Sequence, residues 1–306
     1  MFPLLQYTSF DASAGVKDGV CARALLLLDG GGVDVTETDA WGRNVLWWAC
    51  YKGLDAVALR LLDLDGVDVD AKDSTSGTNP LWCACNEGLD AVALRLLDIG
   101  GVDVDAKHTI GTTPLWCACA RGLGVVALRL LDIGVVDVNA KHSISGTTPL
   151  WCACNMGLDA VALRLLDIGG VDVDAKDSTN GTNVLYWACC KGLDAVALRL
   201  LDIGGVDVDA KNSRDGTNPL FWACCKGLDA VALRLLDIGG VDVDAKDSTS
   251  GTNVLWQACY KGLDVVALRL LDIGGVDVDA KNSRNGIDAK HSTDGVNVLY
   301  VACYSG

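Results

Sequence analysis

The sequence lacks any apolar run long enough to cross a membrane, because Arg or Asp interrupts every long hydrophobic stretch. Its first ten residues, MFPLLQYTSF, contain neither a basic segment nor a sustained apolar one, so they do not resemble a signal peptide. We therefore expect no membrane insertion and an intracellular protein, cytoplasmic with a nuclear location left open. The 14 cysteines fall mostly inside predicted helices, which favours free, buried thiols in a reducing compartment.

Positive charge is also scarce. The 25 Lys and Arg residues stand against 40 Asp and Glu residues, which gives a formal net charge of −15. Such a surface repels phosphate backbones, so we expect no nucleic-acid partner. It suits a basic protein partner, or it serves only to keep the chain soluble.

The chain also has no singular catalytic or metal-binding constellation. Every acidic residue belongs to a repeated column, whereas an enzyme needs one distinct site, so we expect no catalytic activity and no cofactor. Pairs such as Cys83 and Cys85 lack zinc-site spacing and point to different sides of a helix. The VDVDAKDSTSG segments lack the Gly and Glu of a calcium loop, and His108, His142 and His291 lie in predicted turns. We expect no metal site.

What the chain does contain is a repeat with a period of 34 or 35 residues. The segment GLDAVALRLLD, or a near copy, begins at Gly53, Gly88, Gly122, Gly157, Gly192, Gly227 and Gly262, with a degenerate copy at Gly19. A second segment, of the form N-P/V-L-W-x-A-C, occurs eight times, and its Leu falls at Leu46, Leu81, Leu115, Leu150, Leu185, Leu220, Leu255 and Leu299.

Each repeat predicts two short helices. The first spans about residues 79–86, where Thr78 or Asn79 can cap it and Pro80 suits the first turn. The second spans about residues 89–98 and ends at a Gly-Gly pair. Its apolar residues fall at i, i+3, i+4, i+7 and i+8, which is one helical stripe. A lone repeat cannot bury that stripe, so we predict a solenoid in which neighbouring repeats cover one another.

The repeat GTTPLWCACARGLGVVALRLLDIGVVDVNAKHSISG resembles the ankyrin repeat. Thr113-Pro114-Leu115 matches the TPL signature, Ala118 the small residue where the helices approach, and Gly122 the Gly between them. Leu130-Leu131 and Val138-Asn139-Ala140 match the leucine pair and the closing segment. This resemblance implies an all-α fold, an ankyrin-type helix-turn-helix repeat solenoid with extended turns between repeats.

One column departs from the family. Where the family has His after TPL, this chain has an aromatic residue, so the bonding made by His is expected to be absent and replaced by bulk. The residues of this aromatic column are Trp47, Trp82, Trp116, Trp151, Tyr186, Phe221, Trp256 and Tyr300.

The repeats set the predicted domain boundaries. Residues 1–18 form an N-terminal segment, interpreted as a degenerate cap, and residues 19–306 form the array. Its repeats are 19–41 (partial), 42–76, 77–110, 111–145, 146–180, 181–215, 216–250, 251–294 with an extended loop over 282–295, and 295–306 (partial).

Differences between repeats are confined to one part of each repeat. Residues 157–191 and 227–261 differ only at Asn180/Ser250, Tyr186/Trp256, Trp187/Gln257 and Cys190/Tyr260, that is, in the turn and the first helix. In ankyrin-like proteins these parts line the concave surface that grips partners. We therefore predict a protein–protein interaction scaffold, with aromatic residues as anchors. Its predicted partner-binding residues are Trp48, Tyr51, Lys52, Asn86, Glu87, Arg121, Met156, Trp187, Lys191, Arg214, Trp222, Lys226, Gln257, Tyr260 and Lys261.

Three alternative hypotheses stay open. In the first, the array is a regulatory or targeting segment of a larger protein, which the last repeat favours because it has a first helix and no second. In the second, it is an RNA-binding helical repeat, since some RNA-binding families share the 35-residue, two-helix unit. In the third, it is a recently amplified repeat without a selected partner.

Overall fold

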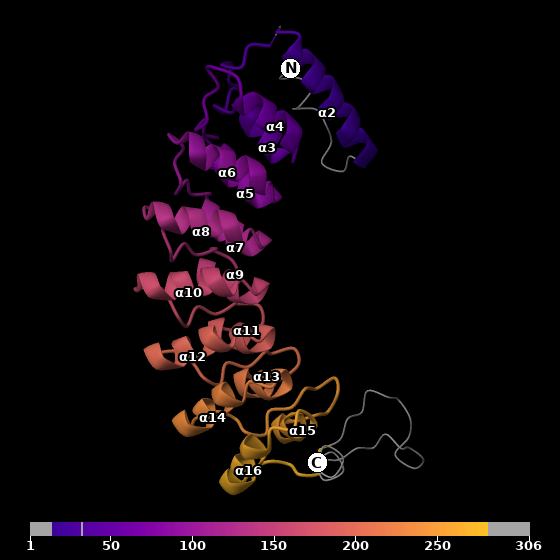
Figure 1. The fold of residues 1–306 in the computed structure, drawn as a ribbon, viewed down its shortest axis with the longest axis vertical. Helices are drawn as coiled ribbons and strands as arrows, with labels where there is room; N and C mark the ends of the chain where they lie inside the picture. The colour runs from indigo at the N-terminus through magenta and orange to yellow at the C-terminus, as the bar shows by residue number, and fades with distance from the viewer. Residues whose placement is uncertain (1–13, 32, 281–306) are drawn as a thin grey trace. The chain divides into compact units, whose positions relative to one another are not determined.

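The computed structural model describes residues 14–31 and 33–280, and their regular structure is helical (Figure 1). The chain divides into an N-terminal unit, Met1–Ser143, and a C-terminal unit, Ile144–Gly306. The N-terminal unit contains α2 (Ala14–Asp29), α3 (Val45–Tyr51), α4 (Asp55–Leu62), α5 (Pro80–Glu87), α6 (Asp90–Ile99), α7 (Pro114–Arg121) and α8 (Gly124–Ile133). The C-terminal unit contains α9 (Pro149–Met156), α10 (Asp159–Ile168), α11 (Val184–Lys191), α12 (Asp194–Ile203), α13 (Pro219–Lys226), α14 (Asp229–Ile238), α15 (Val254–Tyr260) and α16 (Asp264–Ile273).

The helices alternate between the two predicted kinds, which confirms the all-α repeat solenoid. The first helices are α3, α5, α7, α9, α11, α13 and α15, and the second helices are the even-numbered ones from α4 on. Within each unit, first helices pack against first helices and second helices against second helices, as α11, α13 and α15 do. The predicted repeat boundaries, including the cap over residues 1–18, stay predictions. The loop over 282–295 and the last partial repeat lie outside the described residues.

Local sequence sets the helix ends. Asn79 caps α5, because its side-chain oxygen accepts a hydrogen bond of 2.9 Å from the backbone N–H of Trp82. Pro80 occupies the first turn, where its missing N–H is harmless. Gly88 ends the helix with a φ of 76°, a left-handed conformation that favours glycine. The two helices of this repeat, α5 and α6, begin and end one residue later than the predicted bounds of 79–86 and 89–98.

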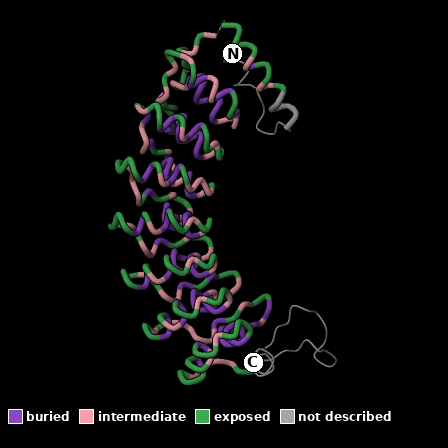
Figure 2. The backbone as a smooth tube through the Cα atoms, in the orientation of Figure 1, coloured by how far each residue is buried: buried purple, intermediate pink, exposed green. Residues whose placement is uncertain are grey.

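The apolar stripe of the second helices and most of each first helix form the core, and Figure 2 shows the buried positions along these helices. Val57, Ala58 and Leu61 of α4 are fully buried. Burial of the next position depends on the following repeat. Leu236 of α14 is 6% exposed, whereas the equivalent Leu271 of α16 is 49% exposed. Stacking, rather than the helix pair itself, thus removes this column from water.

The charged residues of the second helices pair between repeats. The sequence places Asp three residues after each Arg, a spacing that favours pairs within one helix. The Arg side chain instead reaches back to the preceding second helix, because these helices lie side by side. Arg95 pairs with Asp63 at 3.5 Å, and Arg234 with Asp202 at 3.6 Å. Both partners are well exposed, so each pair adds little stability.

The aromatic column corrects a prediction. We expected bulk to replace the hydrogen bonds that His makes in the family. The polar tips of several aromatic side chains make bonds to the next repeat instead. Trp47 Nε1 donates to the carbonyl of Thr78 at 3.2 Å, and the Tyr186 hydroxyl lies 2.9 Å from Thr217 Oγ1. Where the following turn is one residue shorter, Trp82 Nε1 lacks a partner.

Candidate functional site

The candidate surface consists of the C-terminal ends of the first helices and the turn tips that precede these helices. Its predicted residues differ widely in exposure, and this difference separates side chains that are able to meet a partner from those that hold the repeat together.

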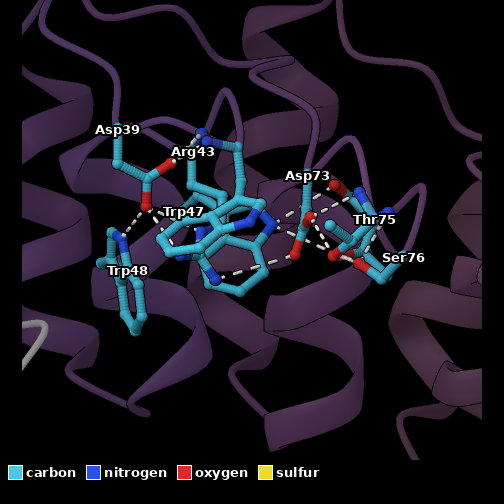
Figure 3. A network of polar contacts seen from close by, with 9 residues as sticks. Asp39, Arg43, Trp47, Trp48, Asp73, Thr75 and Ser76 are labelled. Atoms are coloured by element: carbon cyan, nitrogen blue, oxygen red, sulfur yellow. Dashed lines mark hydrogen bonds and ion pairs between the residues drawn. The ribbon is translucent and has the colours of Figure 1, made fainter.

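In the N-terminal unit, an aromatic cluster surrounds the guanidinium of Arg43 (Figure 3). The guanidinium carbon lies 4.4 Å from the ring centroid of Trp48, 4.5 Å from that of Trp41 and 5.1 Å from that of Trp47. Arg43 also forms ion pairs of 2.8 Å with Asp39 and 3.8 Å with Asp73. This geometry is that of cation–π stacking inside the protein.

The cluster removes Trp48 from the set of exposed candidates. Its side chain is buried, and its Nε1 donates to Asp39 at 3.3 Å. Burial alone would raise the pKa of Asp39, but the hydrogen bonds and charge of Arg43 hold that pKa below its ordinary value. Sequence reasoning missed Trp41 and Arg43, because both precede the first helix and fall outside the recurring columns. Trp41, which is 47% exposed, is the accessible ring of the cluster.

The other candidates of this unit lie at the ends of successive first helices. The Tyr51 ring is half-buried and stacks on Trp47 with 4.8 Å between centroids. Glu87 and Arg121 are exposed. Lys52 and Asn86 are half-buried. The structure therefore brings five of the six predicted residues of this unit to the surface, at the ends of α3, α5 and α7, which pack in sequence.

In the C-terminal unit, one column has a double role. Trp187 Nε1 donates to Thr182 Oγ1 at 3.1 Å, and Trp222 Nε1 donates to Thr217 Oγ1 at 3.0 Å. Gln257 Nε2 makes the equivalent bond to Thr252 Oγ1 at 3.1 Å. Both Trp side chains are half-buried, and Gln257 is buried. This column thus fixes the turn to the helix, and only the two Trp residues retain an accessible part.

The remaining candidates of this unit are exposed: Met156, Lys191, Arg214, Lys226, Tyr260 and Lys261. Each lysine lies near an aromatic ring. Lys191 Nζ is 5.6 Å from the Trp187 ring centroid, Lys226 Nζ is 5.9 Å from that of Trp222, and Lys261 Nζ is 6.0 Å from that of Tyr260. The same cation and ring therefore recur on three first helices that pack in sequence, although the ring comes from a different column in the last.

The cysteines belong to the core rather than to the surface. Cys85 is fully buried, and burial raises the pKa of its thiol to about 12. Cys190 and Cys225 are the half-buried thiols of the candidate surface. Among the described residues, no group of three or more His, Cys, Asp or Glu side chains is arranged to hold a metal ion. Nor does any helix in the described ranges have the length and apolar character needed to span a membrane.

Comparison with known families gives a match over most of the chain. The family model described as "Ankyrin repeats (3 copies)" matches residues 12–108, 86–177 and 162–247. No curated protein matches the chain.

Proposed function

Because the chain belongs to the ankyrin repeat family, whose repeats generally mediate protein–protein interaction, we propose that it is a scaffold that binds a protein partner on the surface formed by its turn tips and first helices. The proposed contacts are the exposed and half-exposed side chains of this surface. Trp48 and Gln257 act behind it, by holding Asp39 and Thr252 in place.

One observation carries this proposal: repeats with a common frame differ in the side chains that face outward. Cys190 in one repeat is replaced by the exposed Tyr260 in another, while the second helices of these two repeats, 159–168 and 229–238, are identical. A frame that is copied while its outer contacts change is what a binding surface requires. The second helices also have exposed positions, yet those positions are nearly constant.

The prediction of a basic partner comes from the net charge of the whole chain. It applies best to the second helices and the turns after them, where the carboxylates gather. The alternative of a regulatory or targeting segment involves the same binding, carried out within a larger protein. An RNA-binding function is disfavoured by the excess of carboxylates.

The test is capture of proteins from a cell lysate with and without nuclease treatment. The variant Met156→Ala, Arg214→Ala, Tyr260→Ala removes exposed side chains of the surface. A control, Arg199→Ala, Arg234→Ala, removes exposed side chains of the second helices. We expect proteins that the parent chain and the control retain and the first variant loses, irrespective of nuclease. Nuclease-sensitive capture, or equal capture by all three chains, would contradict the proposal.

A further inference from the structure

Six cations in the described part of the C-terminal unit form ion pairs that link one repeat to another. Lys176, Lys211 and Lys246 each lie 2.7–2.8 Å from an Asp of the next repeat. The second-helix residues Arg199, Arg234 and Arg269 lie 3.5–3.6 Å from an Asp of the preceding repeat. In a chain with a net charge of −15, such pairing is expected, because carboxylates outnumber cations.

Four cations of the candidate surface differ from these. Within the described part of the unit, no carboxylate oxygen lies within 4.0 Å of a side-chain nitrogen of these four residues, which are Lys191, Arg214, Lys226 and Lys261. All four are exposed. The three first helices concerned, α11, α13 and α15, contain no Asp or Glu. An acidic protein thus presents a row of unneutralised positive charge at one surface.

The acids of the turn tips are engaged within their own turns. Asp177 accepts from the N–H of Thr179 at 2.6 Å. Asp215 accepts from the hydroxyl of Thr217 at 2.6 Å. Asp247 accepts from the hydroxyl of Thr249 at 2.6 Å. These bonds hold the carboxylates inside their turns. The acids that follow the three lysines, Asp194, Asp229 and Asp264, begin the second helices and form no ion pair with them, so the lysine ammonium groups remain open to an external anion.

From this arrangement we propose that the first-helix surface of the C-terminal unit binds an acidic, extended protein segment through Lys191, Arg214, Lys226 and Lys261. The inference rests on the proposed function and specifies the chemistry of the partner. It reverses, for this surface, the charge that the composition of the whole chain favours for a partner.

The spacing of the row sets the pattern of the segment. Packed helices lie roughly 8–10 Å apart, so successive lysines are separated by about that distance. A chain extended in the polyproline II conformation has three residues per turn and advances about 3.1 Å per residue, so acidic residues at every third position share one face, about 9 Å apart, and meet each lysine in turn. Apolar side chains between the acids would face the accessible parts of Trp187, Trp222 and Tyr260.

An acidic segment fits better than a nucleic acid. Phosphate groups also attract lysine, but a polynucleotide carries a charge at every residue and would meet the turn carboxylates as well as the lysines. A segment with separated carboxylates avoids that repulsion.

The test uses fluorescein-labelled peptides and the whole chain. One peptide has Glu at every third position between Ser and Leu, a second has the same composition with the Glu residues contiguous at one end, and a third has Lys in place of Glu. We expect the spaced acidic peptide to bind tightest, with an affinity that falls as salt rises. The variant Lys191→Gln, Lys226→Gln, Lys261→Gln should weaken that binding by about tenfold, as expected for loss of several surface charge contacts.

Two matched variants make the result specific. Lys176→Gln, Lys211→Gln, Lys246→Gln removes three paired lysines and should leave peptide binding within about twofold of the parent, because those lysines lie outside the row. The change of Lys191, Lys226 and Lys261 to Glu should transfer preference to the Lys peptide. We expect each variant to fold, because all six lysines are exposed, and circular dichroism checks that it does.

The inference is overturned if the spaced acidic peptide binds no better than the Lys peptide, or if both Gln variants weaken its binding equally. It is also overturned if the binding of single-stranded oligouridine depends more strongly on Lys191, Lys226 and Lys261 than the binding of the acidic peptide does. Repeating the lysate capture with the Lys191, Lys226, Lys261 variant separates this inference from the proposed function. Proteins lost from the Met156, Arg214, Tyr260 variant but kept by the lysine variant would support a scaffold and refute the acidic segment.

Discussion

Replacing Thr113 with asparagine is expected to stabilise the N-terminal unit, because it restores a bridge between repeats that the chain forms elsewhere. Asn218, the equivalent residue in another repeat, donates from Nδ2 to the carboxylate of Asp209 at 2.8 Å and to the carbonyl of Asp242 at 2.9 Å. Asn79, Asn183 and Asn253 make the same two bonds. Thr113 caps its helix with a long contact of 3.4 Å and has no amide to reach either acceptor.

The carboxylate left without this donor is Asp105. It accepts from the N–H of Asp137 at 2.9 Å, and burial raises its pKa above the ordinary value of 3.8. A raised pKa means that the folded state favours the protonated carboxyl, so the stability contributed by Asp105 falls as pH rises through this pKa. An asparagine amide at position 113 would donate to the ionised form and lower the pKa.

The expected gain follows from the two new bonds. A hydrogen bond to a charged group contributes about 1.5–3 kcal/mol, and a neutral one about 0.5–1.5 kcal/mol. Ordering the amide side chain and losing the Thr contacts offsets part of this, so we expect an increase of about 1–2 kcal/mol in the free energy of unfolding. The gain should be full above the pKa of Asp105 in the parent chain and shrink as pH falls through it.

Urea unfolding, followed by tryptophan fluorescence at neutral and acidic pH, measures this change. The reverse variant, Asn218→Thr, is the control and should lose a similar amount, since threonine still caps the helix. If Thr113→Asn is neutral or destabilising while Asn218→Thr costs stability, the bridge is not transferable between repeats and the reasoning is wrong. If neither variant changes stability, the bridge contributes nothing.

The remaining predictions concern burial and titration. Leu236→Ala should destabilise its region by about 2–5 kcal/mol, whereas Leu271→Ala should cost under about 1 kcal/mol because the Leu271 side chain is half exposed. Hydrogen exchange of the amides of α14 and α16 measures both losses, and equal losses would contradict the stacking argument. Burial lowers the pKa of His108 below its ordinary value of 6.5, so its contribution to stability is lost as pH falls below 6.5, and His108→Asn should remove that pH dependence from urea unfolding curves. The half-buried Cys190 and Cys225 should react with a maleimide before the buried Cys189 and Cys224. Mass spectrometry of the labelled peptides measures the order of reaction, and earlier labelling of Cys189 and Cys224 would contradict the orientation of the first helices.

The sequence by itself determined the fold, because each repeat contacts mainly its neighbours. The period of 34 or 35 residues, the capping Asn or Thr, the Gly after each first helix and the apolar stripe all act locally. The same local rules apply along the array, so the predicted helix bounds of 79–86 and 89–98 differ from the observed ones by one residue. The variable columns of the candidate surface also follow from comparing the repeats with one another.

Only the tertiary structure decided which side chains of those columns are accessible. Trp48 is buried because Arg43 and Asp39, which lie before its helix, fold back onto it. Gln257 is buried because its amide bonds to a threonine of the preceding turn. Composition gave the charge of the whole chain but not its distribution. The charge at the surface depends on which cations find a carboxylate across the repeat boundary, and that pairing is a property of three-dimensional neighbours rather than of sequence spacing.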